Sequence, residues 1–382
     1  MSFSRPLRAL DHDFSAAVSI GTGVVVALFW SAVGPSSYQR AINEAWPNHF
    51  FRQVSIDSVH SLVASALMTL FFFAIGLELS RELRTGALTK ATFVVPPVLG
   101  AIGGMAGTAL LSYLFGELTN SGALRRGWGV PMATDIAFTL GVLALVGRRL
   151  PSPIRIFLLT LAVADDAFSV VVLAFTGATH ARLAGIVALP LMIVVGIVIS
   201  RTTRRVGWGL ALLAGLWVCF VWANVEPPLA GVIAGLLISF DNEWAPRLEH
   251  SMGRCSTGFV LPLFALVSCG VDWHEFSRHS KTLTIVTSLV AIRILGKVVG
   301  ISGGVGAARL IRFRLDPSIT WPLLASVSVL CAIGFTVPLL FAGTLFGTRS
   351  ATYGAFTVGL LAASLIATVF GVLLLRMQTR VP

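Results

Sequence analysis

Four ionisable side chains stand inside stretches of this sequence that are otherwise apolar, and they are the residues best able to do chemistry. They are Asp135, Asp165, Asp166 and Lys297. A charge in the interior of a membrane costs several kcal/mol, and residues of this kind usually line ion pathways or proton relays. The pattern therefore predicts an ion-handling site, provided that the apolar stretches cross a membrane.

The adjacent pair Asp165 and Asp166 is the most informative. Neighbouring residues on a helix project about 100° apart, so the two carboxylates cannot share one partner symmetrically. One can face a cavity while the other pairs with a cation on a neighbouring helix, and Lys297 is the only deep lysine. For Asp135 and Lys297, a structural ion pair that only holds helices together remains an alternative. Such an ion pair would need only one of the two carboxylates Asp165 and Asp166. Arg293, one turn from Lys297, can extend its guanidinium to the surface.

These groups suggest competition between a proton and a metal cation. Desolvation in general favours the protonated form of a carboxyl group. A hard cation such as Na⁺ or Li⁺ prefers oxygen ligands, which the carboxylates, the Thr134 hydroxyl and unwound backbone carbonyls could provide. If both ions bind the same oxygens, binding one expels the other. Alternating access to the two sides of a membrane would turn that competition into exchange.

The composition supports a membrane as the solvent. Charged residues make up 12% of the 382 residues and hydrophobic residues 55%, and the mean hydropathy is +0.86. A soluble domain usually has about a quarter of its residues charged. The net charge of +11 comes from basic residues scattered in short loops, so it does not indicate nucleic-acid binding. The four cysteines have no metal-ligand spacing and fit core packing, and no cofactor is expected.

Twelve apolar stretches are long enough to be membrane spans, so we expect an all-α integral membrane protein with one transmembrane domain over residues 1–382. The predicted spans are residues 15–33, 59–79, 92–115, 122–146, 154–176, 183–200, 206–222, 226–240, 257–271, 283–307, 320–346 and 351–375. An even number of spans puts both termini on one side, and most basic residues in the connecting segments fall on that side. The opposite side holds Arg40, Arg52, Arg125, Arg126, Arg182, Arg278, Lys281 and Arg349. This bias predicts that both termini are cytoplasmic. The long segment 34–57 is expected to form a compact external hairpin or an interfacial segment.

Two of the spans are expected to be interrupted. The fourth contains Gly129-Val130-Pro131 just before Thr134-Asp135, and the eleventh contains Ala332-Ile333-Gly334 before Pro338. Breaks in a membrane helix survive only where protein or a water-filled cavity surrounds them. Spans three to five and ten to twelve flank the two breaks symmetrically, which predicts inverted three-helix repeats with a discontinuous middle helix and a binding site at mid-membrane.

The sequence resembles the NhaA-type sodium/proton antiporters from about residue 14 to residue 375, with motifs in the order of that family. The motifs that carry the resemblance are Phe72-Phe73-Ala74-Ile75-Gly76-Leu77-Glu78, Arg126-Gly127-Trp128-Gly129-Val130-Pro131-Met132-Ala133-Thr134-Asp135-Ile136-Ala137-Phe138, Asp165-Asp166, Leu229-Ala230-Gly231-Val232, Arg247-Leu248-Glu249-His250, Leu261-Pro262-Leu263-Phe264, Gly296-Lys297 and Cys331-Ala332-Ile333-Gly334-Phe335-Thr336. That family is a standard example of inverted repeats, so the repeat argument is not independent of the resemblance.

The resemblance implies twelve helices with crossing discontinuous helices four and eleven, in the inner membrane. It also implies electrogenic exchange of two protons inward for one Na⁺ or Li⁺ outward. By position, Asp166 resembles the principal cation ligand, and Asp165 resembles its proton-carrying neighbour that pairs with Lys297. Thr134 and Asp135 resemble the supporting residues of the broken helix. The oligomeric state stays open, with a homodimer among the options.

The resemblance also suggests regulation by pH. The residues at matching positions of the cytoplasmic funnel are Glu78, Glu82, Glu249 and His250. The chain departs from the family pattern at other positions, namely Ser65, Arg126, Phe168 and Glu226. These departures put the pH profile in doubt rather than the exchange chemistry.

Three other functions compete with exchange. A sodium-coupled solute symporter would need more polar residues around a larger cavity than Thr134, Ser326 and Ser328 offer. An intramembrane aspartyl protease is discounted, because neither Asp135 nor Asp165 follows a Gly-x-Gly motif. A membrane scaffold or sensor without transport activity is disfavoured by the intact set of buried charges.

Overall fold

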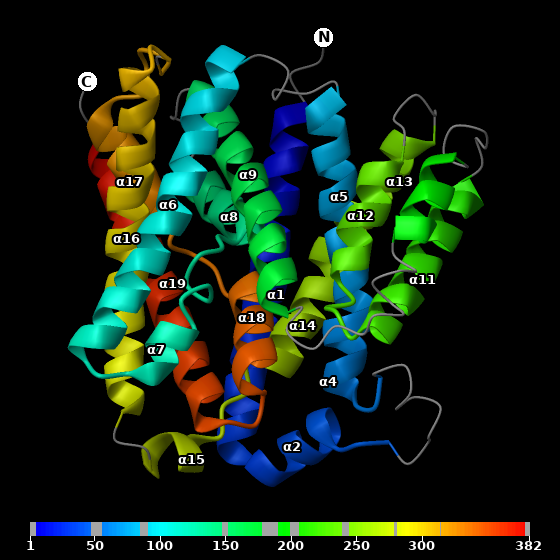
Figure 1. Cartoon of the computed structure of the whole chain (residues 1–382). Helices are drawn as coiled ribbons and strands as arrows, with labels where there is room; N and C mark the ends of the chain where they lie inside the picture. The colour runs from blue at the N-terminus through cyan, green and yellow to red at the C-terminus, as the bar shows by residue number, and fades with distance from the viewer. Residues whose placement is uncertain are drawn as a thin grey trace. The chain divides into compact units, whose positions relative to one another are not determined.

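The computed structural model describes residues 5–46, 56–84, 91–146, 152–177, 190–198, 206–238, 244–278, 281–313 and 315–378. All regular structure in these ranges is helical (Figure 1). Seven helices in them are long and apolar enough to cross a membrane, namely Ser15–Val33, Val59–Arg84, Val94–Leu118, Ile156–Thr176, Ala245–Ser268, Thr282–Leu310 and Ala351–Gln378. The prediction of an all-helical, multi-pass membrane protein is therefore confirmed.

The chain divides into two compact units, and each is described separately. Unit 1 contains residues 1–19, 90–169 and 271–382, and unit 2 contains residues 20–89 and 170–270. Two helices pass from one unit to the other, α1 (Arg5–Val33) after Ser19 and α9 (Ser152–Gly177) after Ser169. The predicted single transmembrane domain stays a prediction.

Unit 1 holds every helix from α6 to α8, most of α9, and the helices after residue 271. Their bounds are α6 Ala91–Leu118, α7 Gly122–Arg126, α8 Ile136–Val146, α15 Trp273–Arg278, α16 Thr282–Leu310, α17 Trp321–Leu330, α18 Thr336–Phe346 and α19 Ala351–Gln378. One buried apolar cluster joins α6, α8, α9, α16, α17 and α19, with members such as Phe157, Leu161, Ile301 and Leu324. This core is the scaffold on which the buried charges are placed.

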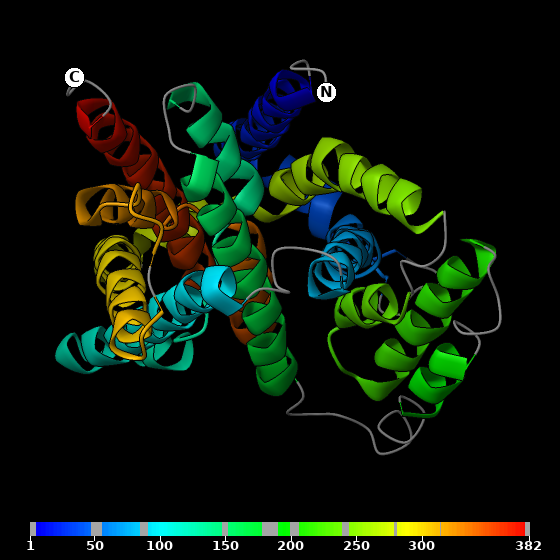
Figure 2. The same ribbon diagram turned by 90° about the horizontal axis from the view of Figure 1, so that it is seen from above.

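The closest helix pair in unit 1 is α6 with α16, which lie side by side in both views (Figures 1 and 2). Glycines line the contact: a Cβ atom added to Gly300 would overlap the carbonyl oxygen of Gly103, and one added to Gly107 would lie 2.7 Å from the carbonyl oxygen of Gly296. Small residues of this kind let helix backbones approach closely where lipid gives no hydrophobic drive for association. Gly103 and Gly107 of α6 thus meet Gly296 and Gly300 of α16 in one interface.

Two pairs of helices in unit 1 are separated by short non-helical segments. α7 begins at a Ser121 cap and ends at Arg126, and residues 127–135 are turns and extended chain before α8. Pro131 lies in this segment, has no N–H to give to a helix and restricts the residue before it. Similarly, α17 begins at a Thr320 cap, and residues 331–335 separate it from α18. Both segments fall where the sequence predicted interrupted spans.

Unit 2 contains most of α1 and the helices of the two middle chain segments. Their bounds are α2 Pro35–Asn43, α4 Val59–Ser61, η1 Leu62–Leu67, α5 Met68–Arg84, α11 Val206–Ala223, α12 Leu229–Leu237, α13 Ala245–Cys255, η5 Ser256–Val260 and α14 Leu261–Ser268, with a further helix at 190–198. α5 and α12 are the closest pair and lie side by side in both views (Figures 1 and 2). The buried Tyr38 hydroxyl of α2 donates to the carbonyls of Leu266 and Val267, and burial raises the pKa of this phenol well above its usual value.

Several helices differ in length from the predicted spans. The helix that overlaps the predicted span 257–271 runs from Ala245 to Ser268. Its first turns are amphipathic and carry charges, so an apolar-run criterion leaves them out. In the predicted span 226–240, the described residues form the nine-residue α12, preceded by Pro227 and Pro228. The predicted span 183–200 lies partly outside the described residues, and so does the predicted external segment 34–57, whose first part is α2.

The glycine interface predicts opposite outcomes for two glycines of α16. Gly300→Ala places its Cβ against the Gly103 backbone, whereas a Cβ at Gly303 meets nothing within 4 Å. We expect Gly300→Ala to destabilise the detergent-solubilised protein by about 1–3 kcal/mol through overpacking. Gly303→Ala should be neutral or slightly stabilising, since alanine favours helix. Thermal unfolding of the two variants measures this, and equal midpoints would contradict the interface.

Candidate ion-binding site

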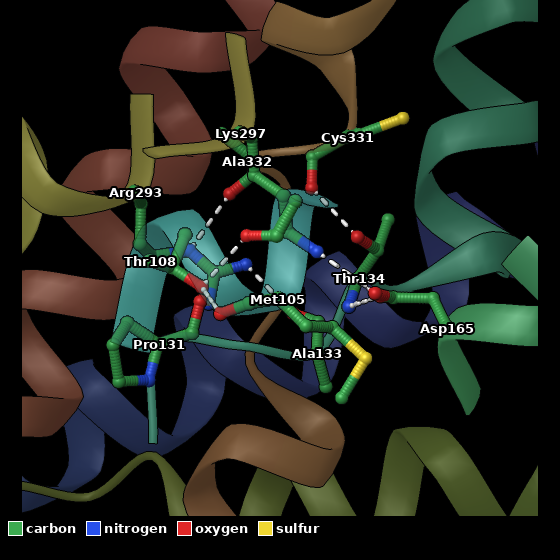
Figure 3. A network of polar contacts seen from close by, with 11 residues as sticks. Met105, Thr108, Pro131, Ala133, Thr134, Asp165, Arg293, Lys297, Cys331 and Ala332 are labelled. Atoms are coloured by element: carbon green, nitrogen blue, oxygen red, sulfur yellow. Dashed lines mark hydrogen bonds and ion pairs between the residues drawn. The ribbon is translucent and has the colours of Figure 1, made fainter. Parts of the chain in front are cut away.

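The two non-helical segments of unit 1 contact each other through backbone and side-chain hydrogen bonds. The Asp135 N–H donates to the Ile333 carbonyl at 2.9 Å. The Thr134 hydroxyl donates to the Cys331 carbonyl at 2.8 Å (Figure 3). The segment between α7 and α8 is thereby tied to the segment between α17 and α18, although 197 residues separate Thr134 from Cys331.

A buried ion pair lies beside this contact. Lys297 of α16 donates to both oxygens of Asp165 on α9, at 3.0 Å to Oδ1 and 3.1 Å to Oδ2. Both side chains are fully buried. The Thr134 N–H also donates to Asp165 Oδ2, at 2.7 Å (Figure 3). One carboxylate therefore links α9, α16 and the segment before α8.

Asp135 lies where two helices begin. Its Oδ2 accepts a hydrogen bond from the Thr336 hydroxyl at 3.1 Å, and its carboxylate also interacts with the backbone N–H groups of Phe138 and Thr336. Phe138 lies in the first turn of α8, and Thr336 is the first residue of α18. Helix N-termini carry partial positive charge and unpaired N–H groups, so one carboxylate stabilises both ends.

Arg293 interacts with the same region through carbonyl oxygens. Its guanidinium donates from Nε to Ala332 at 2.9 Å, from Nη1 to Pro131 at 3.2 Å and from Nη2 to Ala133 at 2.9 Å (Figure 3). The side chain is 0% exposed. The expectation that Arg293 extends to the surface is therefore wrong, because its donors are used by backbone carbonyls inside the protein.

Asp166, the expected principal cation ligand, is buried and follows Asp165 on α9, with 5% of its surface exposed. Within the described residues, no three side chains of His, Cys, Asp or Glu gather closely enough to hold a metal ion. A bound cation would therefore need hydroxyl or carbonyl oxygens besides a carboxylate. The Thr134 hydroxyl, which lies in unit 1 as Asp166 does, is an oxygen of this kind.

The charges of the site do not cancel. Among its described residues, unit 1 buries three carboxylates, Asp135, Asp165 and Asp166, and two cations, Arg293 and Lys297. With all five ionised, three negative and two positive charges leave a net charge of −1. A net charge in a low-dielectric interior is costly, and one monovalent cation or one proton neutralises it.

The residues predicted to respond to pH lie in unit 2, and two of them share one ion-pair network. Arg81 of α5 pairs with Glu249 of α13 at 2.9 Å and with Glu82 at 2.7 Å. Glu78 lies one turn before Glu82 on α5 and is partly buried, whereas His250 is exposed. The structure thus brings Glu82 and Glu249 together through a residue that the sequence argument did not select, Arg81. Its position one turn from Glu78 and beside Glu82 was a usable signal.

These features define the class: a helical membrane protein with ionised side chains buried beside two non-helical segments. The family described as Na⁺/H⁺ antiporter 1 matches residues 8–375. The chain is 34% identical to a Na⁺/H⁺ antiporter NhaA 2 of Kineococcus radiotolerans, over 94% of this chain and 81% of the relative. It is 32% identical to the Na⁺/H⁺ antiporter NhaA of Salmonella arizonae, over 98% of this chain and 100% of the relative. A third relative, the Na⁺/H⁺ antiporter NhaA of Rhizorhabdus wittichii, is 36% identical over 84% of this chain and 85% of the relative.

The chain therefore belongs to the Na⁺/H⁺ antiporter 1 family. This confirms the resemblance seen in the sequence motifs. Its relatives are transporters, in keeping with the expectation that the protein is not an enzyme.

The ion pair between Lys297 and Asp165 predicts a large loss of stability when one partner is removed. Lys297→Met leaves a buried carboxylate without its cation, which costs about 3–5 kcal/mol in comparable buried pairs. The double variant Lys297→Met/Asp165→Asn should recover part of this loss, since no unpaired charge remains. Chemical unfolding in detergent measures both.

Lys281→Met is the matched control for that measurement. Lys281 is exposed just before α16, and within the described part of the chain its side chain donates to the Asn120 carbonyl. Its replacement should change the free energy of unfolding by no more than about 0.5 kcal/mol. Equal stability of Lys297→Met and Lys281→Met would mean that the ion pair does not hold α9 to α16.

Proposed function

We propose that this protein exchanges cytoplasmic Na⁺ or Li⁺ for external protons across a bacterial inner membrane. The observation that carries the proposal is the fully buried pair of Asp165 and Lys297 with a second buried carboxylate, Asp166, next to it. A structural fastener needs only one carboxylate. Membership of the Na⁺/H⁺ antiporter 1 family supports the same function.

In the proposed mechanism, Asp166 is the principal ligand of the cation and the Thr134 hydroxyl is a further ligand. When the cation leaves, Asp166 takes up one proton and the Asp165–Lys297 pair carries the second. The net charge of −1 on the five buried groups favours one bound cation. The cation-loaded site is then neutral and the site with two protons carries +1, so the two loaded states differ by one charge.

This difference in charge would make exchange electrogenic. Each cycle moves one net charge inward, worth about 2.3 kcal/mol at 100 mV. Since a tenfold concentration ratio is worth about 1.4 kcal/mol, the potential sustains roughly a fifty-fold Na⁺ gradient without any pH difference. An electroneutral exchanger would not gain this contribution.

The proposal also includes the way in which the helices described above combine into membrane crossings. α7 with α8 and α17 with α18 would each form one interrupted crossing, in inverted repeats formed by crossings three to five and ten to twelve of a twelve-crossing protein. The hydrogen bonds between the two interrupted segments support this arrangement. Cytoplasmic termini, alternating access and a homodimer stay predictions.

The proposal predicts that Asp166→Asn abolishes exchange. In proteoliposomes, wild-type protein should dissipate a proton gradient when Na⁺ or Li⁺ is added, and the variant should not, because an amide neither carries a proton nor neutralises the cation. The partly exposed Asp316, in the segment before α17, gives the matched control Asp316→Asn, which should exchange like wild type. Unchanged exchange in Asp166→Asn would refute the site assignment.

For the same preparations, electrogenic exchange predicts a Na⁺-dependent current on a solid-supported membrane. Wild-type protein should give a current whose sign follows two protons against one Na⁺, and Asp166→Asn should give none. Active exchange without current would refute the two-for-one stoichiometry and leave the exchange function intact.

We further propose that the network around Arg81 contributes to pH regulation, together with Glu78 and His250. Replacing Arg81 by Met removes the positive charge that pairs with Glu82 and Glu249, and a cluster of carboxylates that loses its cation in general takes up protons at higher pH. We therefore expect the pH of half-maximal exchange to move upward. The pH profile of the exchange current measures the shift, with Arg125→Met as the control, since Arg125 pairs with Glu117 on the exposed surface of unit 1. Identical profiles would contradict a regulatory role.

A further inference from the structure

We propose that Arg293 is a positioning residue for ion exchange: its guanidinium replaces the backbone donors lost at both helix breaks and so holds Thr134 against Asp165. This inference rests on the proposed function. It concerns a residue that has no part in the proposed cation and proton binding.

The guanidinium reaches both non-helical segments at once. Pro131 and Ala133 belong to the segment before α8, and Ala332 belongs to the segment before α18. Three different nitrogen atoms of one planar group each donate to one of these carbonyls. A guanidinium presents its donors in a fixed fork, so one side chain sets the spacing of all three carbonyls.

The carbonyls need these donors because their helical partners are engaged elsewhere. In a continuous helix, the Pro131 carbonyl would accept from the N–H of Asp135, four residues later. That N–H instead donates to Ile333. The Ala332 carbonyl would likewise accept from the N–H of Thr336, which interacts with the Asp135 carboxylate. A membrane interior offers no water for carbonyls freed in this way. Arg293 takes the place of the missing N–H groups at both breaks.

The consequence for the site runs through one peptide. Ala133, whose carbonyl binds Arg293, directly precedes Thr134, whose N–H donates to Asp165 at 2.7 Å. Thr134 is also the proposed hydroxyl ligand of the cation. Releasing the Ala133 carbonyl would free this peptide to rotate, and both contacts of Thr134 would loosen.

A second possible role for Arg293 gives an effect of the opposite sign. A fixed positive charge near the site repels a cation, so removing the charge alone would strengthen Na⁺ binding and lower KM. Loss of positioning disorders the ligands and raises KM. The direction of the change in KM therefore distinguishes the two roles.

The experiment compares Arg293→Met, Arg293→Lys and Arg309→Met for Na⁺-driven exchange in proteoliposomes. Arg309 is the matched control: it lies on the same helix, with its guanidinium 4.5 Å from the Trp321 ring centroid. We expect Arg293→Met to raise KM for Na⁺ about tenfold, equivalent to about 1.4 kcal/mol. Arg293→Lys keeps the charge but not the fork, so its KM should lie between. Arg309→Met should match wild type.

Hydrogen–deuterium exchange supplies a readout that does not depend on transport. In Arg293→Met and Arg293→Lys, amides in residues 127–135 and 331–335 should exchange faster together, and in Arg309→Met they should not. An unchanged or lowered KM in Arg293→Met, or unchanged amide exchange in both segments, would overturn the proposal. If Arg293→Met does not fold, the same two measurements on Arg293→Lys decide. A wild-type protein without Na⁺/H⁺ exchange would refute the proposed function instead, and amide exchange would still test the positioning.

Discussion

The constraint on which this structure depends is the need to satisfy backbone groups in two non-helical segments of unit 1, residues 127–135 and 331–335. The helix ends beside each segment leave N–H groups and carbonyls without helical partners. Asp135 accepts from N–H groups at the starts of α8 and α18, and Arg293 donates to carbonyls of both segments. A carboxylate and a guanidinium thus replace hydrogen bonds that lipid cannot supply. The unwound segments can then carry polar groups to Asp165.

Much of the site could be predicted from sequence because charge in an apolar segment is conspicuous. Because Lys297 is the only deep lysine, the residue types predict that it pairs with one of Asp165 and Asp166, and the family resemblance points to Asp165. Gly129, Pro131 and Gly334 mark the two non-helical segments. The partners of Arg293 could not be predicted in the same way. Backbone carbonyls have no sequence signature, and a long side chain in a membrane helix usually extends to the surface.

The fold, like the site, could be predicted from the sequence only in part. Apolar runs located the long helices, but they missed the first turns of the helix that begins at Ala245, since amphipathic turns lack a continuous apolar run. The contact between the backbones of Gly103 and Gly300 is likewise a property of the folded structure that neither segment shows by itself. Sequence patterns indicate which secondary structure a segment prefers, whereas contacts between distant segments depend on how the chain folds in three dimensions.

The glycine interface has a mechanical consequence for the exchange cycle. Where α6 and α16 touch backbone to backbone, neither helix can slide or rotate past the other without a steric clash. The Cα atom of Lys297 is therefore fixed to the α6–α16 pair, and the Lys297 side chain passes close to Gly104 of α6. Any separation of Lys297 from Asp165 must therefore come from rotation about side-chain bonds or from movement of α9 relative to the α6–α16 pair as a whole.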